Sequence, residues 1–131
     1  MYVCEKVYDI TVCANYGGFA VVDMREISYS EPHYHSKNAI EIYILLEGSA
    51  TIVVGNEIVF SKKSAIIITP PLTAHYVIPD KDWVIGCINL PNFKVEEYHA
   101  ISQTDATFKF DRQQFEELIA QKNKSSLEFE F

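Results

Sequence analysis

The sequence is poor in the features that mark several large classes of protein. Its three cysteines, Cys4, Cys13 and Cys87, are too far apart to form the closely spaced pairs of a zinc knuckle or a redox centre. We expect them to be small buried apolar groups in a reducing compartment. The N-terminus has no basic region followed by an apolar stretch, and no apolar run approaches the roughly 20 residues that cross a bilayer. These absences predict a cytoplasmic protein outside the membrane.

Positive charge is also scarce. The chain has 11 Lys and Arg against 18 Asp and Glu, a formal net charge of −7. Binding to a phosphate backbone is driven by Lys and Arg, so this balance argues against direct contact with nucleic acid. In contrast, 48% of the residues are hydrophobic and 13% are aromatic. The sequence therefore predicts a globular protein, and its 131 residues suit one domain spanning 1–131.

Short runs rich in Val, Ile, Tyr and Phe indicate an all-β protein. They alternate with turn residues and predict strands at 7–13, 18–30, 33–35, 40–48, 50–55, 57–60, 64–70, 74–78 and 82–90. Such spacing without helical periodicity is typical of an antiparallel barrel or sandwich, with a core at about 7–95. Gly55-Asn56, between two of these runs, predicts a two-residue type II′ hairpin turn.

One helix is predicted near the end of the sequence, at about 111–124. Asp111 is a plausible N-cap, Gln114 occupies the capping-box position, and Phe115, Leu118 and Ile119 share one face. We expect this helix to lie against the barrel or against a partner subunit. The tail after it alternates apolar and acidic residues, which fits either a chain cut short or a flexible end.

The histidines are the main chemical signal. His33 and His35 are two residues apart on a predicted strand, so they share a face about 6 to 7 Å apart. An antiparallel return brings Glu41 back beside them, and His75 joins if its strand faces theirs across a closed barrel. Three imidazoles and one carboxylate suit Fe, Mn, Ni, Cu or Zn. The alternative is a pocket without metal, in which the histidines hydrogen-bond each other or a water. His99, outside this pattern, is expected to be a surface or packing residue.

These residues resemble the two sequence motifs of the cupin family. The first motif matches His33, His35, Glu41 and Gly48, and the second matches Pro70 and His75. The resemblance covers about residues 20–90 and implies a double-stranded β-helix, or jelly-roll, barrel. In this sequence it implies metal ligands at His33, His35, Glu41 and His75.

The sequence departs from the cupin pattern at several positions. Five residues separate His35 from Glu41, where the family usually has three or four. Ser64 and Leu72 replace two expected glycines, and Pro79 stands where an Asn is often found. Leu72 in place of glycine indicates a loop that does not need a positive φ.

Within the cupins, residues 33–77 look most like the N-terminal effector-binding and dimerisation domain of AraC-type transcription regulators. The resemblance implies a barrel that binds a small polar effector, such as a sugar, and a homodimer formed through the helix near Phe115 and Leu118. It also implies that DNA is bound by a separate helix-turn-helix domain, of which these 131 residues show no sign. The candidate ligand-binding residues are His33, His35, Glu41 and His75 from the motifs, and Tyr43, which strand alternation places on the same face as Glu41.

Strand alternation adds the expected walls of the pocket. If Glu41 points inward, so do Tyr43 and Leu45, and Val77 accompanies His75. The run Ile66, Ile67 and Ile68 has no polar face, which predicts a strand covered on both sides.

Two other functions remain open from the sequence. A small metal-dependent cupin enzyme, such as a dioxygenase or an isomerase, would use the same ligands. No motif places a further acid or base, so we name no catalytic residue and favour a binding module. The third possibility is a structural barrel with a filled interior.

Overall fold

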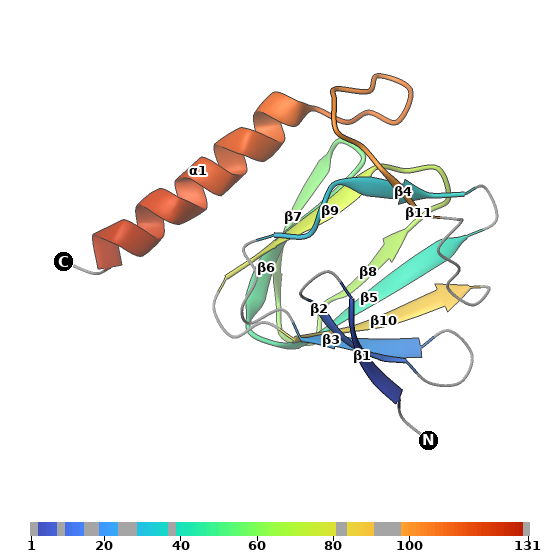
Figure 1. Ribbon diagram of the computed structural model, residues 1–131. Helices are drawn as coiled ribbons and strands as arrows, with labels where there is room; N and C mark the ends of the chain where they lie inside the picture. The colour runs from blue at the N-terminus through green and yellow to red at the C-terminus, as the bar shows by residue number, and fades with distance from the viewer. Residues whose placement is uncertain are drawn as a thin grey trace.

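The protein is an antiparallel β-barrel of two sheets followed by one C-terminal helix (Figure 1). The computed structural model describes residues 3–7, 10–14, 19–23, 29–36, 39–80, 84–90 and 98–129. Within them, one sheet has the order β1-β2-β3-β10-β5-β8 and the other has the order β11-β4-β9-β6-β7. The predicted all-β fold with a terminal helix is confirmed.

The element bounds follow the predicted runs closely. The larger sheet contains β1 (Val3–Val7), β2 (Ile10–Ala14), β3 (Phe19–Asp23), β10 (Val84–Leu90), β5 (Ile40–Glu47) and β8 (Ile66–Thr69). The smaller sheet contains β11 (Tyr98–Ala100), β4 (His33–His35), β9 (His75–Pro79), β6 (Ser49–Val54) and β7 (Glu57–Lys62). The helix α1 spans Arg112–Phe129. No helix in these residues is long and apolar enough to cross a membrane.

Four elements differ from the sequence-based prediction. The run predicted at 18–30 is a strand only over β3, residues 24–28 lie outside the described residues, and residues 29–30 are not in a strand. β1 lies before the predicted start of the barrel, and the short strand β11 was not expected. α1 continues to Phe129 rather than ending at 124, so much of the alternating tail is helical. Alternation of apolar and acidic residues is also typical of a strand, which is why the pattern concealed the helix.

The barrel interior is filled from both sheets by strand alternation. Tyr43 and Leu45 of β5 and Val77 of β9 are buried there, as predicted. The rest of this interior cluster consists of Ala50, Ile52, Ile85 and Cys87. Cys87 is buried as expected, while the side chains of Cys4 and Cys13 lie outside the described part of the protein.

The loops show one prediction confirmed and one wrong. A type II′ turn requires a positive φ at its first central residue and not at its second. Between β6 and β7, Gly55 has φ +61° and Asn56 does not have a positive φ, so the predicted turn is confirmed. Leu72, however, has φ +54°, so this loop does need the left-handed conformation. The Leu72 amide donates to the carbonyl of His35 at 3.0 Å, a contact that ties the loop to β4.

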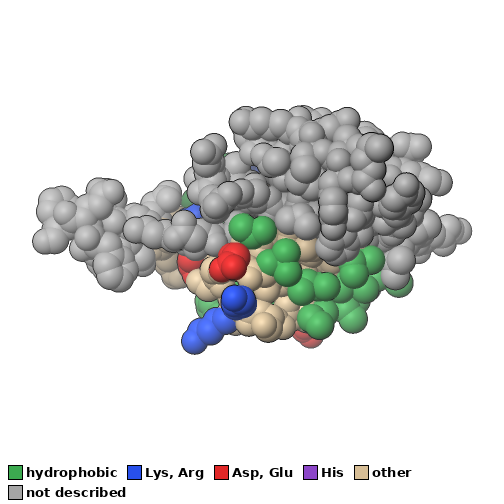
Figure 2. Space-filling model, turned by 90° about the horizontal axis from the view of Figure 1, so that it is seen from below, with side chains coloured by type: hydrophobic (Ala, Val, Ile, Leu, Met, Phe, Trp, Pro, Cys, Tyr) green, Lys and Arg blue, Asp and Glu red, His purple; other side chains and the backbone are tan. Residues whose placement is uncertain are grey.

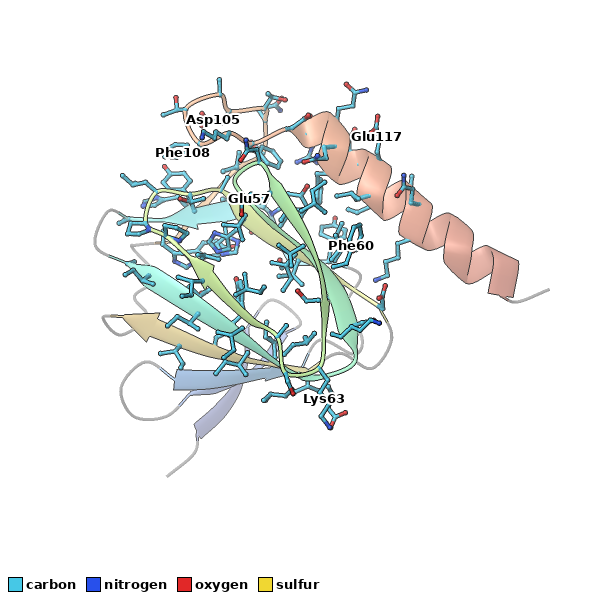
Figure 3. All side chains as sticks on the ribbon, turned by 180° about the vertical axis from the view of Figure 1, so that it is seen from behind. Glu57, Phe60, Lys63, Asp105, Phe108 and Glu117 are labelled. Carbon is cyan, nitrogen blue, oxygen red and sulfur yellow. The ribbon has the colours of Figure 1, made fainter. Side chains whose placement is uncertain are left out.

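A second hydrophobic cluster joins the helix to the outer face of the smaller sheet. Tyr76 of β9 meets Phe115 of α1 with ring centroids 4.9 Å apart, and Phe110 lies 6.2 Å from the same ring. The first turns of the helix therefore pack on the outside of the barrel, and Figure 3 shows from behind that the helix then extends away from it, with Glu117 on its exposed side. The Asp111 carboxylate accepts the amide of Gln114 at 3.1 Å, which confirms the predicted N-cap.

The outer face of the larger sheet has no such cover within the described residues. Ile66 is 64% exposed and Ile68 is 60% exposed, while Ile67 packs on the interior cluster. α1 does not provide the predicted cover of this side, because it lies over the other sheet, so cover by a partner stays a prediction. Figure 2 shows hydrophobic side chains gathered in one area of the face seen from below.

Tyr76 offers a test of the packing between sheet and helix. Its hydroxyl is buried without a hydrogen-bond partner among the described residues. Burial, and to a smaller extent the charge of Asp111, raises the pKa of this hydroxyl to about 12. Removing an unsatisfied hydroxyl stabilises a fold, so Tyr76→Phe should raise the free energy of unfolding by up to about 1 kcal/mol in urea titrations. Tyr76→Ala should lower it by about 3 kcal/mol or more.

The same variant should alter the response to alkali. Because the folded pKa exceeds the reference value of 10.0, the unfolded chain loses this proton first, and the free energy of unfolding falls as the pH rises from 10 to 12. Urea titrations across that range should show a smaller loss in Tyr76→Phe than in the wild type. An equal loss in both proteins would contradict this account of Tyr76.

Candidate functional site

The structure brings the four predicted metal ligands together inside the barrel. His33 and His35 come from β4, Glu41 from the start of β5, and His75 from the start of β9, where it pairs directly with His33. One ligand atom from each lies within 4.8 Å of those of the others. All four residues are buried, with 0–7% of their surface exposed. The longer loop after His35 therefore does not carry Glu41 out of reach.

Backbone carbonyls orient two of the imidazoles. Nδ1 of His33 lies 2.6 Å from the carbonyl oxygen of Glu31, and Nδ1 of His75 lies 2.9 Å from that of Thr73. A carbonyl only accepts, so each Nδ1 carries the proton and donates it. Nε2 is then the nitrogen left to face the cluster. This is the arrangement that fixes the ring of a metal-binding histidine in many proteins.

The Glu41 carboxylate lies between two of the imidazoles. Oε2 is 3.3 Å from Nε2 of His35, and Oε1 is 3.5 Å from Nε2 of His75. Burial by itself raises the pKa of Glu41, but His35 and His75 outweigh it and hold the pKa well below its usual range. For His33, burial and then the neighbouring His75 lower the pKa to about 3. At neutral pH the cluster thus holds a carboxylate and a neutral His33.

A cation fits this set of atoms. Oε1 of Glu41 and Nε2 of His75 face each other without a hydrogen bond, although both are buried. A proton on this nitrogen or a metal ion between the two atoms would satisfy the pair. Imidazole nitrogens and a carboxylate are ligands that divalent transition metals accept. Because the ligand atoms of all four residues lie within 4.8 Å of one another, these residues could hold a metal ion.

Tyr43 and Cys87 form the nearest part of the barrel interior. They are directly paired across β5 and β10, and the Tyr43 ring lies 6.1 Å from that of His75. Burial and the charge of Glu41 raise the pKa of both groups well above the usual range. Tyr43 therefore keeps its hydroxyl proton, and Cys87 remains a thiol rather than a thiolate ligand.

The sequence analysis missed two residues beside the cluster, Tyr98 and Glu31. Tyr98 of β11 stacks on His33 with centroids 4.4 Å apart, and its hydroxyl donates to the Glu31 carboxylate at 2.9 Å. Glu31 could have been noticed because it lies two residues before His33, but nothing in the sequence places Tyr98 near the histidines.

The remaining histidine, His99, lies outside the cluster. It stacks on Tyr34 and hydrogen-bonds Ser36, which confirms its predicted packing role.

A hollow of about 320 Å³ lies outside the histidine cluster. It is formed by the β6–β7 turn, the loop after β8 and residues 107–109, and none of the four candidate ligands lines it. Two of its lining residues contact the cluster: the Thr73 carbonyl accepts from Nδ1 of His75, and the Leu72 amide donates to the carbonyl of His35. We place the candidate site at the histidines, because the charged and orienting groups converge there.

Comparison with known proteins agrees with this geometry. Residues 17–127 match the family model described as the AraC-like ligand binding domain. No curated protein sequence matches the chain.

Solved structures share the fold at low sequence identity. KdgF from Halomonas sp. is 14% identical with a TM-score of 0.59, covering 72% of this chain and 89% of that one. The nucleoside dehydratase Pac13 from Streptomyces is 13% identical with a TM-score of 0.56, covering 76% and 84%. The plu4264 protein of Photorhabdus luminescens is 24% identical with a TM-score of 0.55, covering 72% and 83%. At these identities, the likeness shows the fold alone.

Metal binding by the cluster can be tested directly. Wild-type protein dialysed against Zn²⁺, Ni²⁺ or Co²⁺ should retain one ion per chain by elemental analysis. The double variant His33→Ala, His75→Ala loses two of the four donors, so its affinity should fall on the order of 100-fold or more.

His99→Ala is the matched control, because His99 lies outside the cluster, and it should bind like the wild type. Wild-type protein without metal, or equal retention by the double variant, would contradict the site.

Proposed function

Because this chain belongs to the AraC-like ligand-binding domain family, we propose that it is the effector-binding domain of a transcription regulator. The effector would be a small polar metabolite, such as a sugar, bound at His33, His35, Glu41, Tyr43 and His75. The observation that carries the proposal is the convergence of three imidazoles, one carboxylate and the Tyr43 ring in a buried space. Such a site combines burial with a few oriented polar groups, which is how small-ligand sites achieve specificity.

A divalent transition metal held by His33, His35, Glu41 and His75 would give this site a Lewis acid for oxygen atoms of the ligand. The chain's own groups have separate roles. The carbonyls of Glu31 and Thr73 keep the Nε2 atoms of His33 and His75 turned inward. Tyr43 keeps a donor hydroxyl close to Glu41, and the apolar cluster below it excludes water.

The signal from the site would reach α1 through the two strands that carry the histidines. On β4, Tyr34 lies between His33 and His35 and faces outward, where it stacks on Phe108 with centroids 4.0 Å apart. On β9, Tyr76 follows His75 and contacts Phe115 of α1. Figure 3 shows Phe108 in the segment that leads to the helix. A shift of β4 or β9 on ligand binding would therefore press on the start of α1.

Ligand screening with a structural readout tests the proposal. Titration of sugars and organic acids, with and without divalent metal, should yield heat with at least one compound. That compound should slow amide hydrogen exchange in 112–122, since it would stabilise the packing of α1. Phe108→Ala should reduce this slowing several-fold, because it removes the ring stacked on Tyr34.

Phe60→Ala serves as the control, since Phe60 is 78% exposed and is not part of the cluster under α1. Equal slowing in the wild type and Phe108→Ala would contradict the route through Tyr34. Binding without any change in the helix would contradict a sensing role.

The homodimer implied by the family is part of the same proposal. Phe115, expected at its interface, is 3% exposed and packs on Tyr76 of its own chain, while Leu118 is partly buried against the same cluster. A dimer through α1 would have to use another side of the helix. Light scattering over a range of concentrations tests it, and a monomer throughout would overturn it. DNA contact and a cytoplasmic location would belong to the complete regulator, with DNA bound by a domain outside these 131 residues.

A metal-dependent enzyme is the second candidate. The buried three-histidine, one-glutamate cluster favours it, and one structural neighbour is described as a nucleoside dehydratase. Conversion of a bound compound by metal-loaded protein, and not by the double variant His33→Ala, His75→Ala, would favour this reading over the regulator.

A further inference from the structure

We propose that Tyr98 and Glu31 are positioning residues that hold the imidazole of His33 with Nε2 turned toward Glu41. The inference rests on the proposed metal and effector site and adds two residues to it. Glu31 is not among the residues whose ligand atoms meet in the cluster, and the Tyr98 hydroxyl donates to the Glu31 carboxylate. Their role would be to fix one ligand before a metal or an effector arrives.

The two residues form a closed set of contacts with His33. The Glu31 backbone carbonyl accepts from Nδ1 of His33 at 2.6 Å, and the Glu31 carboxylate accepts from the Tyr98 hydroxyl at 2.9 Å. The Tyr98 ring stacks on the His33 imidazole, with centroids 4.4 Å apart and planes inclined by 24°. Glu31 therefore positions His33 twice, once directly and once through Tyr98.

Neighbouring rings restrict rotation of His33. Tyr98 stacks on the imidazole, and the ring of His75 lies 4.1 Å away at an angle of 61°. Rotation of His33 about its side-chain bonds would collide with these rings and break the bond from Nδ1 to Glu31. Because His33 is 6% exposed as a whole, most of its ring contacts protein atoms, and these contacts fix its orientation.

The fold places Tyr98 at this point through the short strand β11. Tyr98 pairs with His35 and Ala100 pairs with His33 along β4. The Tyr98 ring also meets His35 edge-on, with centroids 6.0 Å apart. A strand of three residues at the edge of the smaller sheet thus serves to set one aromatic ring over the histidine pair.

A test on metal-free protein isolates the positioning role. Long-range ¹H–¹⁵N spectra of the imidazoles distinguish a ring protonated at Nδ1 from one protonated at Nε2. In the wild type, His33 should be in the Nδ1–H form. Tyr98→Leu should give a mixture of the two forms, while Tyr98→Phe, which keeps the ring but loses the hydroxyl, should lie closer to the wild type.

A second measurement follows the ligand set itself. Co²⁺ should bind Tyr98→Leu about 10- to 100-fold more weakly than the wild type in chelator competition, with an altered visible absorption spectrum. Tyr98→Phe and Glu31→Ala should each cost less, about 3- to 10-fold, because the stacked ring and the backbone carbonyl of residue 31 remain. Tyr29→Leu is the control, since Tyr29 is 44% exposed and contacts Phe115 rather than the histidines. Thermal unfolding of each variant confirms that the protein is folded.

The outcomes separate this inference from the proposed function. A wild-type tautomer and wild-type Co²⁺ affinity in folded Tyr98→Leu would overturn the positioning role. Loss of the single tautomer in that variant, with no metal bound even by the wild type, would support positioning and overturn the metal site.

Discussion

The buried carboxylate of Glu41 is the constraint on which this end of the barrel depends. A charge taken out of water is costly unless nearby groups compensate for it. Here His35 and His75 lie within 3.5 Å of the two carboxylate oxygens and hold the pKa of Glu41 low despite its burial. The imidazoles in turn must keep fixed orientations, and the carbonyls of Glu31 and Thr73 provide them for His33 and His75.

Strand alternation connects this charged cluster to the rest of the molecule. Each strand that turns histidines inward turns a tyrosine outward, Tyr34 on β4 and Tyr76 on β9. Tyr34 packs on Phe108, and Tyr76 packs on Phe110 and Phe115. Phe108 and Phe110 lie in the segment before α1, and Phe115 lies in the helix. The interior site and the external helix therefore share the same two strands, which is the physical basis of the proposed sensing role.

Much of the site could be predicted because it rests on local patterns. His-x-His on a strand places two side chains on one face whatever surrounds it, and inward Tyr43 follows from Glu41 by parity. The fold followed from regular β runs, and the helix start followed from Asp111. The prediction that was wrong concerned loop conformation, the left-handed Leu72, and long-range packing also decided that α1 does not cover Ile66 and Ile68.

The sequence by itself determined which residues carry the chemistry, because residue type and spacing along a strand decide which side chains share a face. Only the tertiary structure decided that these groups meet, through the pairing of His33 with His75 and the return of β5. It alone placed Tyr98 over His33 and α1 over Tyr76. The contacts of His33 with His75 and with Tyr98, and of Tyr76 with α1, join residues more than 35 positions apart. Over such separations, local periodicity carries no information about which surfaces face each other.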